Sequence, residues 1–456
     1  MIYNVTEYLE RNARLMPEKI AVSDRSGSYT WRELKDRARR IATSLLSEGT
    51  ERGIMVYGDK SFDVLSVFLG AAYAGLFYSL MSTELPASRL RQSAEVLGVG
   101  TVVADGEHLD AAREIFEGKR IIASYELCER EADDKLLAAA AARHIDTDPL
   151  YINFTSGSTG TPKGIAVCHR SVVDFIECFT DIFGITSDDV IANQSPFDFD
   201  VSVKDIYSSL KTGAELSIVP RELFSQPAAL LDWLCDHGTT TMIWAVSALC
   251  LISTFHGLDY KVPEKVNKIL FSGEVLPYKH FKTWKTHLPE AVFVNLYGPT
   301  EITCNCTYHI LDAERDYSGG IPIGKPFPNE HVFLLDDTDS LIRSDMTDTV
   351  GEICVRGTAL ALGYYNNPAQ CEKHFVQNPL NSAYPETIYR TGDLARYNED
   401  GDLVFSGRKD FQIKYMGHRI ELEEIERAMN AIEGVVRSCC VFDEKRSRLK
   451  GFYVGT

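Results

Sequence analysis

A run of hydroxyl, glycine and lysine residues between positions 154 and 164 offers the clearest chemistry in the sequence. It reads Phe-Thr-Ser-Gly-Ser-Thr-Gly-Thr-Pro-Lys-Gly. Backbone N–H groups of such a loop can face phosphate oxygens, and Lys163 adds a positive charge. The run is not a Walker A loop, because Pro162 stands where that pattern needs its second glycine. It predicts a phosphate-binding loop, and a surface loop rich in serine and glycine is the alternative.

Alternating strand-like and helix-like segments must position this loop. An apolar strand ends at Phe154, and a helical pattern begins near His169. Strands separated by helices predict an α/β fold with parallel sheets covered on both faces. The predicted strands are 54–57, 102–104, 121–123, 151–154, 190–192, 216–219, 240–244, 269–271 and 292–296.

The two ends of the chain predict structures that differ from the alternating strands and helices of the middle. The N-terminal segment reads as an amphipathic helix, and Thr30 with Glu33 forms a capping box before a helix that runs to Glu48. After about Gly320 the segments become short and rich in turns, which predicts a smaller β-rich part. The tail predicts one acidic helix, 421–431, followed by two strands, 438–442 and 449–454.

Composition and charge exclude several classes of function. The chain has 456 residues and a net charge of −18, so nucleic acids and anionic membranes are poor partners. No apolar run is long enough to span a bilayer, and no export signal precedes the first helix. The 11 scattered cysteines are therefore expected to be reduced thiols in a cytoplasm.

Six segments, in order along the chain, resemble the core motifs of the adenylate-forming superfamily. They are 29–34, 154–164, 199–203, 295–301, 389–393 and 407–414. This superfamily includes acyl-CoA synthetases, luciferases and the adenylation domains of nonribosomal peptide synthetases. The resemblance covers essentially the whole chain. It is closest to the peptide-synthetase domains and to D-alanine–carrier-protein ligases.

The resemblance implies a domain organisation. Residues 1–408 would form a large N-terminal adenylation core, built of layered α/β subdomains and a small β-barrel. Residues 409–456 would form part of a small α+β C-terminal lobe, which swings about a hinge at Asp410. Lys414 and Gly417 would lie near the path of a phosphopantetheine arm.

It also implies a reaction: ATP-dependent activation of an amino acid to aminoacyl-AMP, then transfer to the phosphopantetheine of a carrier protein. Lys163, Thr300 and Glu301 would act on the phosphates. Glu301 would hold Mg²⁺, which prefers carboxylate and phosphate oxygens. The nucleotide-binding residues would be Thr155, Ser156, Gly157, Ser158, Thr159, Gly160, Gly273, Asn295, Tyr297, Asp393 and Arg408.

The same alignment implies an amino-acid pocket. Its members would be Phe199, Asp200, Val201, Lys204, Trp244, Leu270, Ser272, Leu296, Cys304 and Asn305. Asp200 would pair with the substrate's α-ammonium, which disfavours fatty and aryl acids. Leu270, Ser272 and Leu296 resemble pockets for serine or cysteine. Lys204 favours aspartate or glutamate if it points inward, and D-alanine is a further alternative.

One departure bears on catalysis. Related sequences end with a lysine in a segment resembling Pro-x-Gly-Lys, and this sequence stops at Thr456 before such a segment. That lysine normally contacts the carboxylate and the phosphate. Slow adenylation is therefore expected, and a nucleotide- and amino-acid-binding module impaired in catalysis is the alternative.

Overall fold

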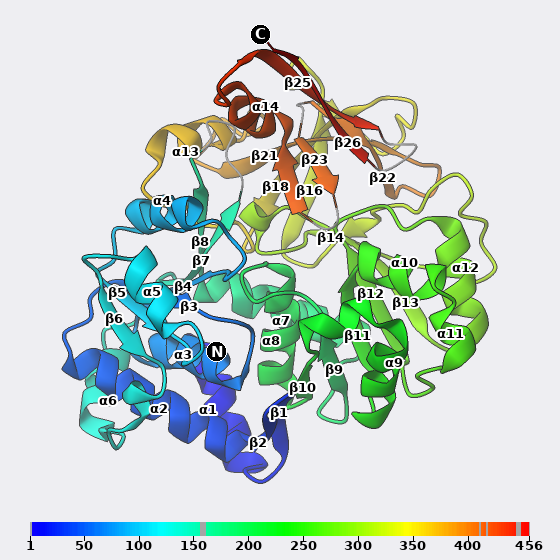
Figure 1. The fold of residues 1–456 in the computed structure, drawn as a ribbon. Helices are drawn as coiled ribbons and strands as arrows, with labels where there is room; N and C mark the ends of the chain where they lie inside the picture. Colours follow the sequence, from blue (N-terminus) through cyan, green and yellow to red (C-terminus); the bar gives the residue numbers. More distant parts are fainter. Residues whose placement is uncertain (1, 156–160, 410–411, 416–417, 444–447, 456) are drawn as a thin grey trace.

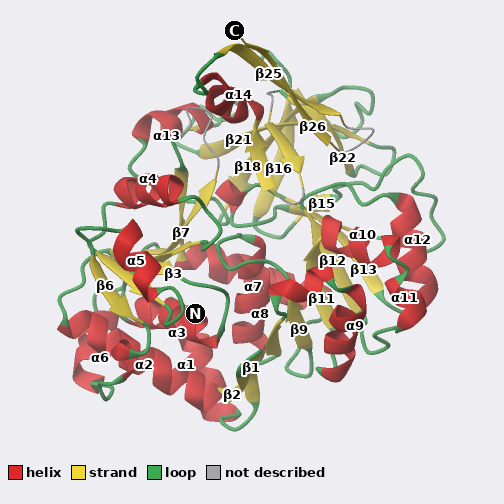
Figure 2. Ribbon diagram, in the orientation of Figure 1, coloured by secondary structure: helices red, strands yellow, loops and turns green. Residues whose placement is uncertain are grey.

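The computed structural model describes residues 2–155, 161–409, 412–415, 418–443 and 448–455. Two large sheets, with helices packed around them, form the lower part of the molecule (Figure 1). A smaller, strand-rich part lies above them, and the C-terminal helix and hairpin are at the top (Figure 2). The mixed α/β architecture confirms the predicted fold class.

The first sheet has seven strands in the order β19-β8-β7-β4-β3-β5-β6. Strands β3 to β7 pair in parallel, whereas β8 and β19 are antiparallel additions at one edge. Its strands are β3 Gly53–Tyr57, β4 Phe77–Met81, β5 Thr101–Ala104, β6 Arg120–Ala123, β7 Pro149–Thr155, β8 Lys163–Cys168 and β19 Gly363–Tyr364. The helices between them are α2 Trp31–Ser47, α3 Phe62–Tyr73, α4 Ala87–Leu97, α5 Leu109–Ile115, η1 Glu126–Cys128 and α6 Asp134–Ala141.

The second sheet has nine strands in the order β15-β14-β13-β12-β11-β9-β10-β1-β2, with a parallel centre and antiparallel edges. Its strands are β1 Ile20–Asp24, β2 Gly27–Thr30, β9 Val190–Asn193, β10 Glu215–Ile218, β11 Thr241–Ala245, β12 Lys268–Ser272, β13 Val292–Tyr297, β14 Thr307–Ile310 and β15 Lys325–Pro326. The helices are α1 Thr6–Leu15, α7 His169–Phe183, α8 Val201–Thr212, η2 Arg221–Ser225, α9 Pro227–Asp236, α10 Val246–Thr254, α11 Gly257–Tyr260, α12 Tyr278–His287 and η3 Thr300–Ile302.

The structure confirms the smaller β-rich part predicted after Gly320. It is an antiparallel sheet in the order β17-β16-β18-β21-β20, with β22 paired to β21. Its elements are β16 Glu330–Leu335, β17 Leu341–Ile342, β18 Gly351–Gly357, α13 Pro368–His374, β20 Phe375–Gln377, β21 Thr387–Tyr397 and β22 Leu403–Arg408. The tail contains β23 Gln412–Tyr415, β24 His418–Glu421, α14 Leu422–Asn430, β25 Val435–Asp443 and β26 Arg448–Gly455.

Two buried clusters pack on the two faces of the nine-stranded sheet. One contains Leu270 and Leu296 with residues of α7 and α8, and it continues to the seven-stranded sheet. The other contains Trp244 and Phe271 with residues of α9, α10 and α12. This division follows from strand geometry, in which successive side chains point to opposite faces.

The helix predicted to begin near His169 is confirmed as α7, and a strand that was not predicted, β8, precedes it. Thr155 on β7 pairs with Lys163 on β8 in an antiparallel register. The run is therefore the connection of a hairpin, and Lys163 has a fixed place at the start of a buried strand.

The domain boundary at residue 408 stays a prediction, and Asp410 lies outside the described residues. Within the described part of the chain, no helix combines the length and apolar character needed to cross a membrane.

Candidate active site

Residues predicted for the amino-acid pocket lie at the carboxyl ends of β12 and β13, opposite the start of α8. Asp200 is the N-cap residue of α8, and Lys204 follows one turn later. The Lys204 Nζ donates to Ser272 Oγ at 3.2 Å and to Asn305 Oδ1 at 2.8 Å. Ligand sites of parallel sheets commonly lie at this edge. Hydrogen bonds thus join three predicted pocket residues, with Asp200 one turn earlier on α8, and Lys204 extends toward Ser272 and Asn305.

A strained turn positions Asn305. Thr303 and Cys304 both have positive φ angles, 50° and 86°, which residues other than glycine rarely adopt. Gly298 packs against this turn so closely that an added Cβ would lie 2.5 Å from the Asn305 Cα. The turn folds back on residues 297–301 and aims Asn305 at Lys204. Cys304 is buried here in the same cluster as Leu270 and Leu296.

Trp244 does not join this pocket, contrary to the sequence-based expectation. It pairs in register with Phe271, whereas its neighbour Ile243 pairs with Leu270. Side chains paired in register on parallel strands share a face, so Ile243, not Trp244, lies on the pocket face. Trp244 is buried on the opposite face, where its indole N–H donates to Ala192 O at 2.8 Å.

The phosphate side of the site centres on Glu301 and Lys163. Glu301 is 1% exposed, and the Tyr364 hydroxyl donates to its Oε1 at 2.7 Å. The Lys163 Nζ lies 5.8 Å from the centroid of the Tyr364 ring. Strand β19 carries Tyr364 and pairs with β8, which carries Lys163. Thr300 begins the 3-10 turn that holds Glu301.

The Glu301 carboxylate is a suitable ligand for a magnesium ion bound together with ATP. Among the described residues, no group of three or more His, Cys, Asp or Glu side chains could hold a metal. Mg²⁺ in phosphoryl-transfer sites commonly uses one or two carboxylates and takes its other ligands from phosphates and water. Glu301 would supply the carboxylate, and the ion would neutralise the phosphates.

The predicted nucleoside side forms a second buried network. Tyr297 donates from its hydroxyl to Asp393 Oδ2 at 2.5 Å, and Arg408 donates to the Oδ1. Burial and the Asp393 charge hold the pKa of Tyr297 well above its usual range. Asn295 donates to Pro322 O at 2.8 Å, so one amide N–H is already used. Gly273 has φ +97° and open space at its Cβ position, which suits close approach of a ligand to the backbone.

Several predicted residues cannot be placed in the site. Ser156, Gly157, Ser158, Thr159 and Gly160 lie outside the described residues, as does Gly417, and the Lys414 side chain is not described. Phe199 and Val201 flank Asp200 at the start of α8, and both are half-buried. Thr155 is described and half-buried at the end of β7.

Three residues join the site without having been predicted. Tyr364 donates its hydroxyl hydrogen bond to Glu301. The His374 ring lies beside Tyr364, with 6.0 Å between the two ring centroids. Burial, and then the Lys163 charge, lower the pKa of His374. Tyr151 is fully buried, and burial followed by the Asp200 charge raises its pKa. The sequence carried one usable signal, the Gly363-Tyr364 pair, which lies between the fourth and fifth motif segments.

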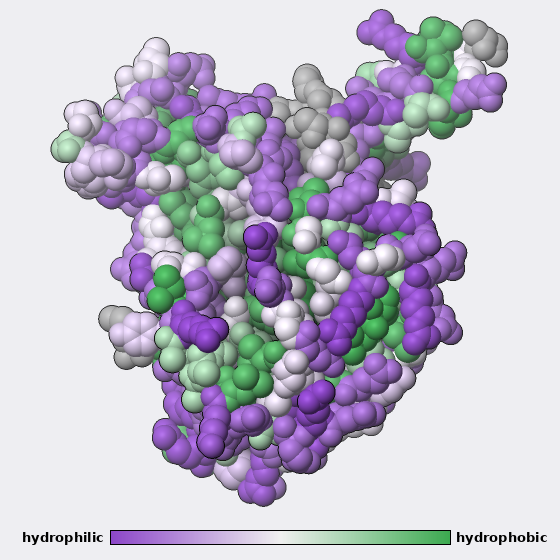
Figure 3. All heavy atoms as spheres, turned by 90° about the vertical axis from the view of Figure 1, so that its left-hand side faces the viewer, coloured by the Kyte–Doolittle hydropathy of each residue, from purple (hydrophilic) through white to green (hydrophobic). Residues whose placement is uncertain are grey.

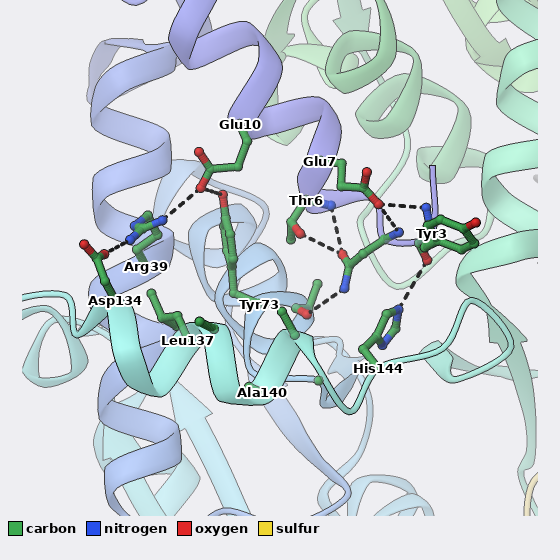
Figure 4. Close-up of a pocket in the computed structure, with 15 residues that line it drawn as sticks. Tyr3, Thr6, Glu7, Glu10, Arg39, Tyr73, Asp134, Leu137, Ala140 and His144 are labelled. Carbon is green, nitrogen blue, oxygen red and sulfur yellow. Dashed lines mark hydrogen bonds and ion pairs between the residues drawn. The ribbon is translucent and has the colours of Figure 1, made fainter. Parts of the chain in front are cut away.

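A cavity of about 640 Å³ lies elsewhere, between α1, α2, α3 and α6 (Figure 4). Its polar side chains bond one another. Arg39 donates to Glu10 Oε1 at 3.0 Å, and the Tyr73 hydroxyl donates to the same oxygen at 2.9 Å. None of the predicted site residues lines it.

Comparison with known proteins assigns the chain to a family. The family of AMP-binding enzymes matches residues 9–365. D-alanine–D-alanyl carrier protein ligase of Lacticaseibacillus casei strain BL23 is 31% identical over 464 residues, covering 100% of this chain and 88% of the relative. This chain is an AMP-binding enzyme.

Other similarities of this AMP-binding enzyme are to parts of longer proteins. Surfactin synthase subunit 1 of Bacillus subtilis strain 168 is 31% identical over 99% of the chain, which spans only 12% of that protein. The structure of holo-PA1221, an NRPS protein containing adenylation and PCP domains, aligns with a TM-score of 0.85 and 25% identity. The alignment covers 100% of this chain and 77% of that one.

Proposed function

We propose that this AMP-binding enzyme is an amino-acid-activating ligase that forms aminoacyl-AMP for transfer to a carrier protein. One observation carries the proposal: a single loop after β13 joins the two halves of the site. Its Glu301 lies in the phosphate network with Tyr364, and its Asn305 lies in the pocket network with Lys204. A carboxylate and a nucleotide bound on either side of this loop would be held next to each other.

The reaction needs positioning more than it needs a protein nucleophile. A carboxylate oxygen of the amino acid attacks the α-phosphorus of ATP, and the bond from that phosphorus to the leaving pyrophosphate breaks. Both reactants are anionic, so charge neutralisation and alignment lower the barrier. Lys163 and Thr300 would bind phosphate oxygens, and Glu301 would hold Mg²⁺. The second step breaks the acyl–phosphate bond as the carrier's phosphopantetheine sulfur forms the thioester.

Asp200 supports an amino acid over a fatty or aryl acid. It lies half-buried at the start of α8, one turn from Lys204. A carboxylate in such a place can pair with a substrate α-ammonium, a group that fatty and aryl acids lack. Leu270, Ser272 and Leu296 favour serine or cysteine within the class of small polar side chains. Aspartate, glutamate and D-alanine are the alternatives.

A carrier-protein partner is supported by the relatives. One is named as a carrier protein ligase, and holo-PA1221 contains a PCP domain beside its adenylation domain. The partner would act in trans or from an adjacent module.

The test is amino-acid-dependent exchange of labelled pyrophosphate into ATP, measured over a panel of amino, fatty and aryl acids. We expect exchange with amino acids only, and its loss in Asp200→Asn with ATP binding retained. Asp188→Asn, which changes an exposed acid, should leave exchange unchanged. Exchange with fatty or aryl acids, or ATP binding without exchange for any acid, would contradict the proposal.

A further inference from the structure

The ammonium group of Lys204 lies inside the pocket without an ion-pair partner. Lys204 is 0% exposed. Its two hydrogen-bond acceptors, Ser272 Oγ and Asn305 Oδ1, are both neutral. Across the ranges that the structure describes, no carboxylate oxygen lies within 4.0 Å of this nitrogen. We infer that Lys204 selects an amino acid with a carboxylate side chain, so that aspartate or glutamate is activated in preference to serine or cysteine. This inference rests on the proposed function.

The neighbouring groups do not supply the missing negative charge. Asp205 follows Lys204 in α8, but it accepts from Asn193 Nδ2 at 2.7 Å, and the same Asn193 side chain accepts from Lys60 at 3.1 Å. Burial raises the pKa of Asp205 to about 7, so this carboxyl is only partly ionised near neutrality. The Cys304 thiol is neutral, because burial raises its pKa to about 12.

The charges balance only with an acidic substrate. The substrate α-ammonium neutralises Asp200, which leaves Lys204 as the uncompensated ion of the pocket. Removing an ion from water costs several kcal/mol unless a counter-ion and hydrogen bonds replace the water. A side-chain carboxylate supplies both, and it is a stronger acceptor for the third N–H of the ammonium than the neighbouring Cys304 sulfur. A serine hydroxyl or a cysteine thiol supplies a weak acceptor and no charge.

The test compares amino acids in the pyrophosphate-exchange assay with three proteins: wild type, Lys204→Met and Lys211→Met. Methionine is similar to lysine in length and removes the charge together with the hydrogen bonds to Ser272 and Asn305. Lys211 lies on the same helix but pairs with Glu177 and Asp181 outside the pocket. Lys211→Met is therefore the matched control. ATP binding and thermal unfolding report whether each variant is folded.

We expect kcat/KM of the wild type for aspartate or glutamate to exceed that for serine, cysteine, asparagine and glutamine by at least about tenfold. Lys204→Met should lose about a hundredfold for the acid and keep its activity with the neutral amide analogue. Faster exchange with serine or cysteine than with both acids would overturn the inference and leave the proposed function intact. Equal losses for all amino acids in Lys204→Met would overturn it as well. Failure of every amino acid, with ATP bound, would contradict the proposed function itself.

Discussion

Tyr364 contacts both charged residues of the proposed phosphate site, Glu301 and Lys163. Its hydroxyl donates to Glu301 Oε1 at 2.7 Å, and the Lys163 ammonium lies over its ring. Glu301 is buried, so this hydrogen bond fixes the orientation of a carboxylate that water cannot solvate. Tyr364 is a positioning residue in this arrangement, because it acts through Glu301.

Removing the Tyr364 hydroxyl should therefore weaken both catalysis and magnesium use. A hydrogen bond to a charged group is worth ~1.5–3 kcal/mol, so Tyr364→Phe should lower the pyrophosphate-exchange rate by roughly tenfold or more. It should also raise the Mg²⁺ concentration needed for half-maximal exchange. Tyr365→Phe is the control, since that ring packs on Phe77 instead. An unchanged Mg²⁺ requirement in Tyr364→Phe would contradict the positioning role.

Glu330 makes stability depend on pH. Burial raises the pKa of this carboxyl to about 8, although Ala359 N donates to its Oε1. The folded protein therefore keeps a proton that the unfolded chain releases near its ordinary pKa of 4.5, and stability falls as the pH rises between these values.

Glu330→Gln should remove that pH dependence. We expect the variant to melt several degrees higher than the wild type at pH 8 and at nearly the same temperature at pH 5. Thermal unfolding followed across this range measures the effect. A constant difference between the two proteins at every pH would show that Glu330 does not titrate as described.

At the scale of elements, a side-chain cap fixes the start of α2. The capping box predicted for Thr30 and Glu33 is present, with Glu33 N donating to Thr30 Oγ1 at 3.2 Å and Thr30 N donating to the Glu33 carboxylate at 2.7 Å. The box starts α2, which packs against α3 beside the seven-stranded sheet.

Thr30→Ala should loosen the first turn of α2 and leave the site unaffected. Loss of a cap costs ~1 kcal/mol, so amide exchange in that turn should accelerate about fivefold in hydrogen-exchange mass spectrometry. Pyrophosphate exchange should not change. Unaltered amide exchange would mean that packing alone holds this end of the helix.

At the scale of the whole molecule, one ion pair joins the C-terminal helix to the first sheet region. Arg89 on α4 donates to Glu424 on α14 at 3.0 Å, and both side chains are largely buried. The face on the left in Figure 1 is otherwise mostly hydrophilic, with several separate hydrophobic patches (Figure 3). The Arg89–Glu424 ion pair helps to hold the C-terminal helix α14 against α4.

Breaking the pair should loosen the tail. Glu424→Ala should increase hydrogen exchange across 422–455 by a few fold, since half-buried ion pairs contribute about 1 kcal/mol. The charge swap Arg89→Glu with Glu424→Arg should restore part of the protection. Glu433→Ala, at an exposed position of the tail, is the control. Full protection in Glu424→Ala would show that other contacts hold the tail.

The sequence by itself determined the fold class, most strands and the chemical character of the site. Local patterns suffice for these, because strand and helix periodicity and the Thr-Ser-Gly-Ser run are properties of neighbouring residues. Lys163 was predicted from such a run, whereas Asp200 and Glu301 were predicted from the resemblance to family motifs. The hairpin strand β8 was missed, since its short apolar run adjoins a helix whose pattern is stronger.

Only the tertiary structure decided which way key side chains point. Ile243, not Trp244, lies on the pocket face of β11, because successive residues of a strand point to opposite faces. The register with β12 sets which of these faces meets α8. Lys204 could have extended outward along its helix, but Ser272 and Asn305, 68 and 101 residues away, hold it inside. Tyr364 meets Glu301 across 63 residues. Such contacts depend on how the sheets and loops pack, which no local pattern encodes.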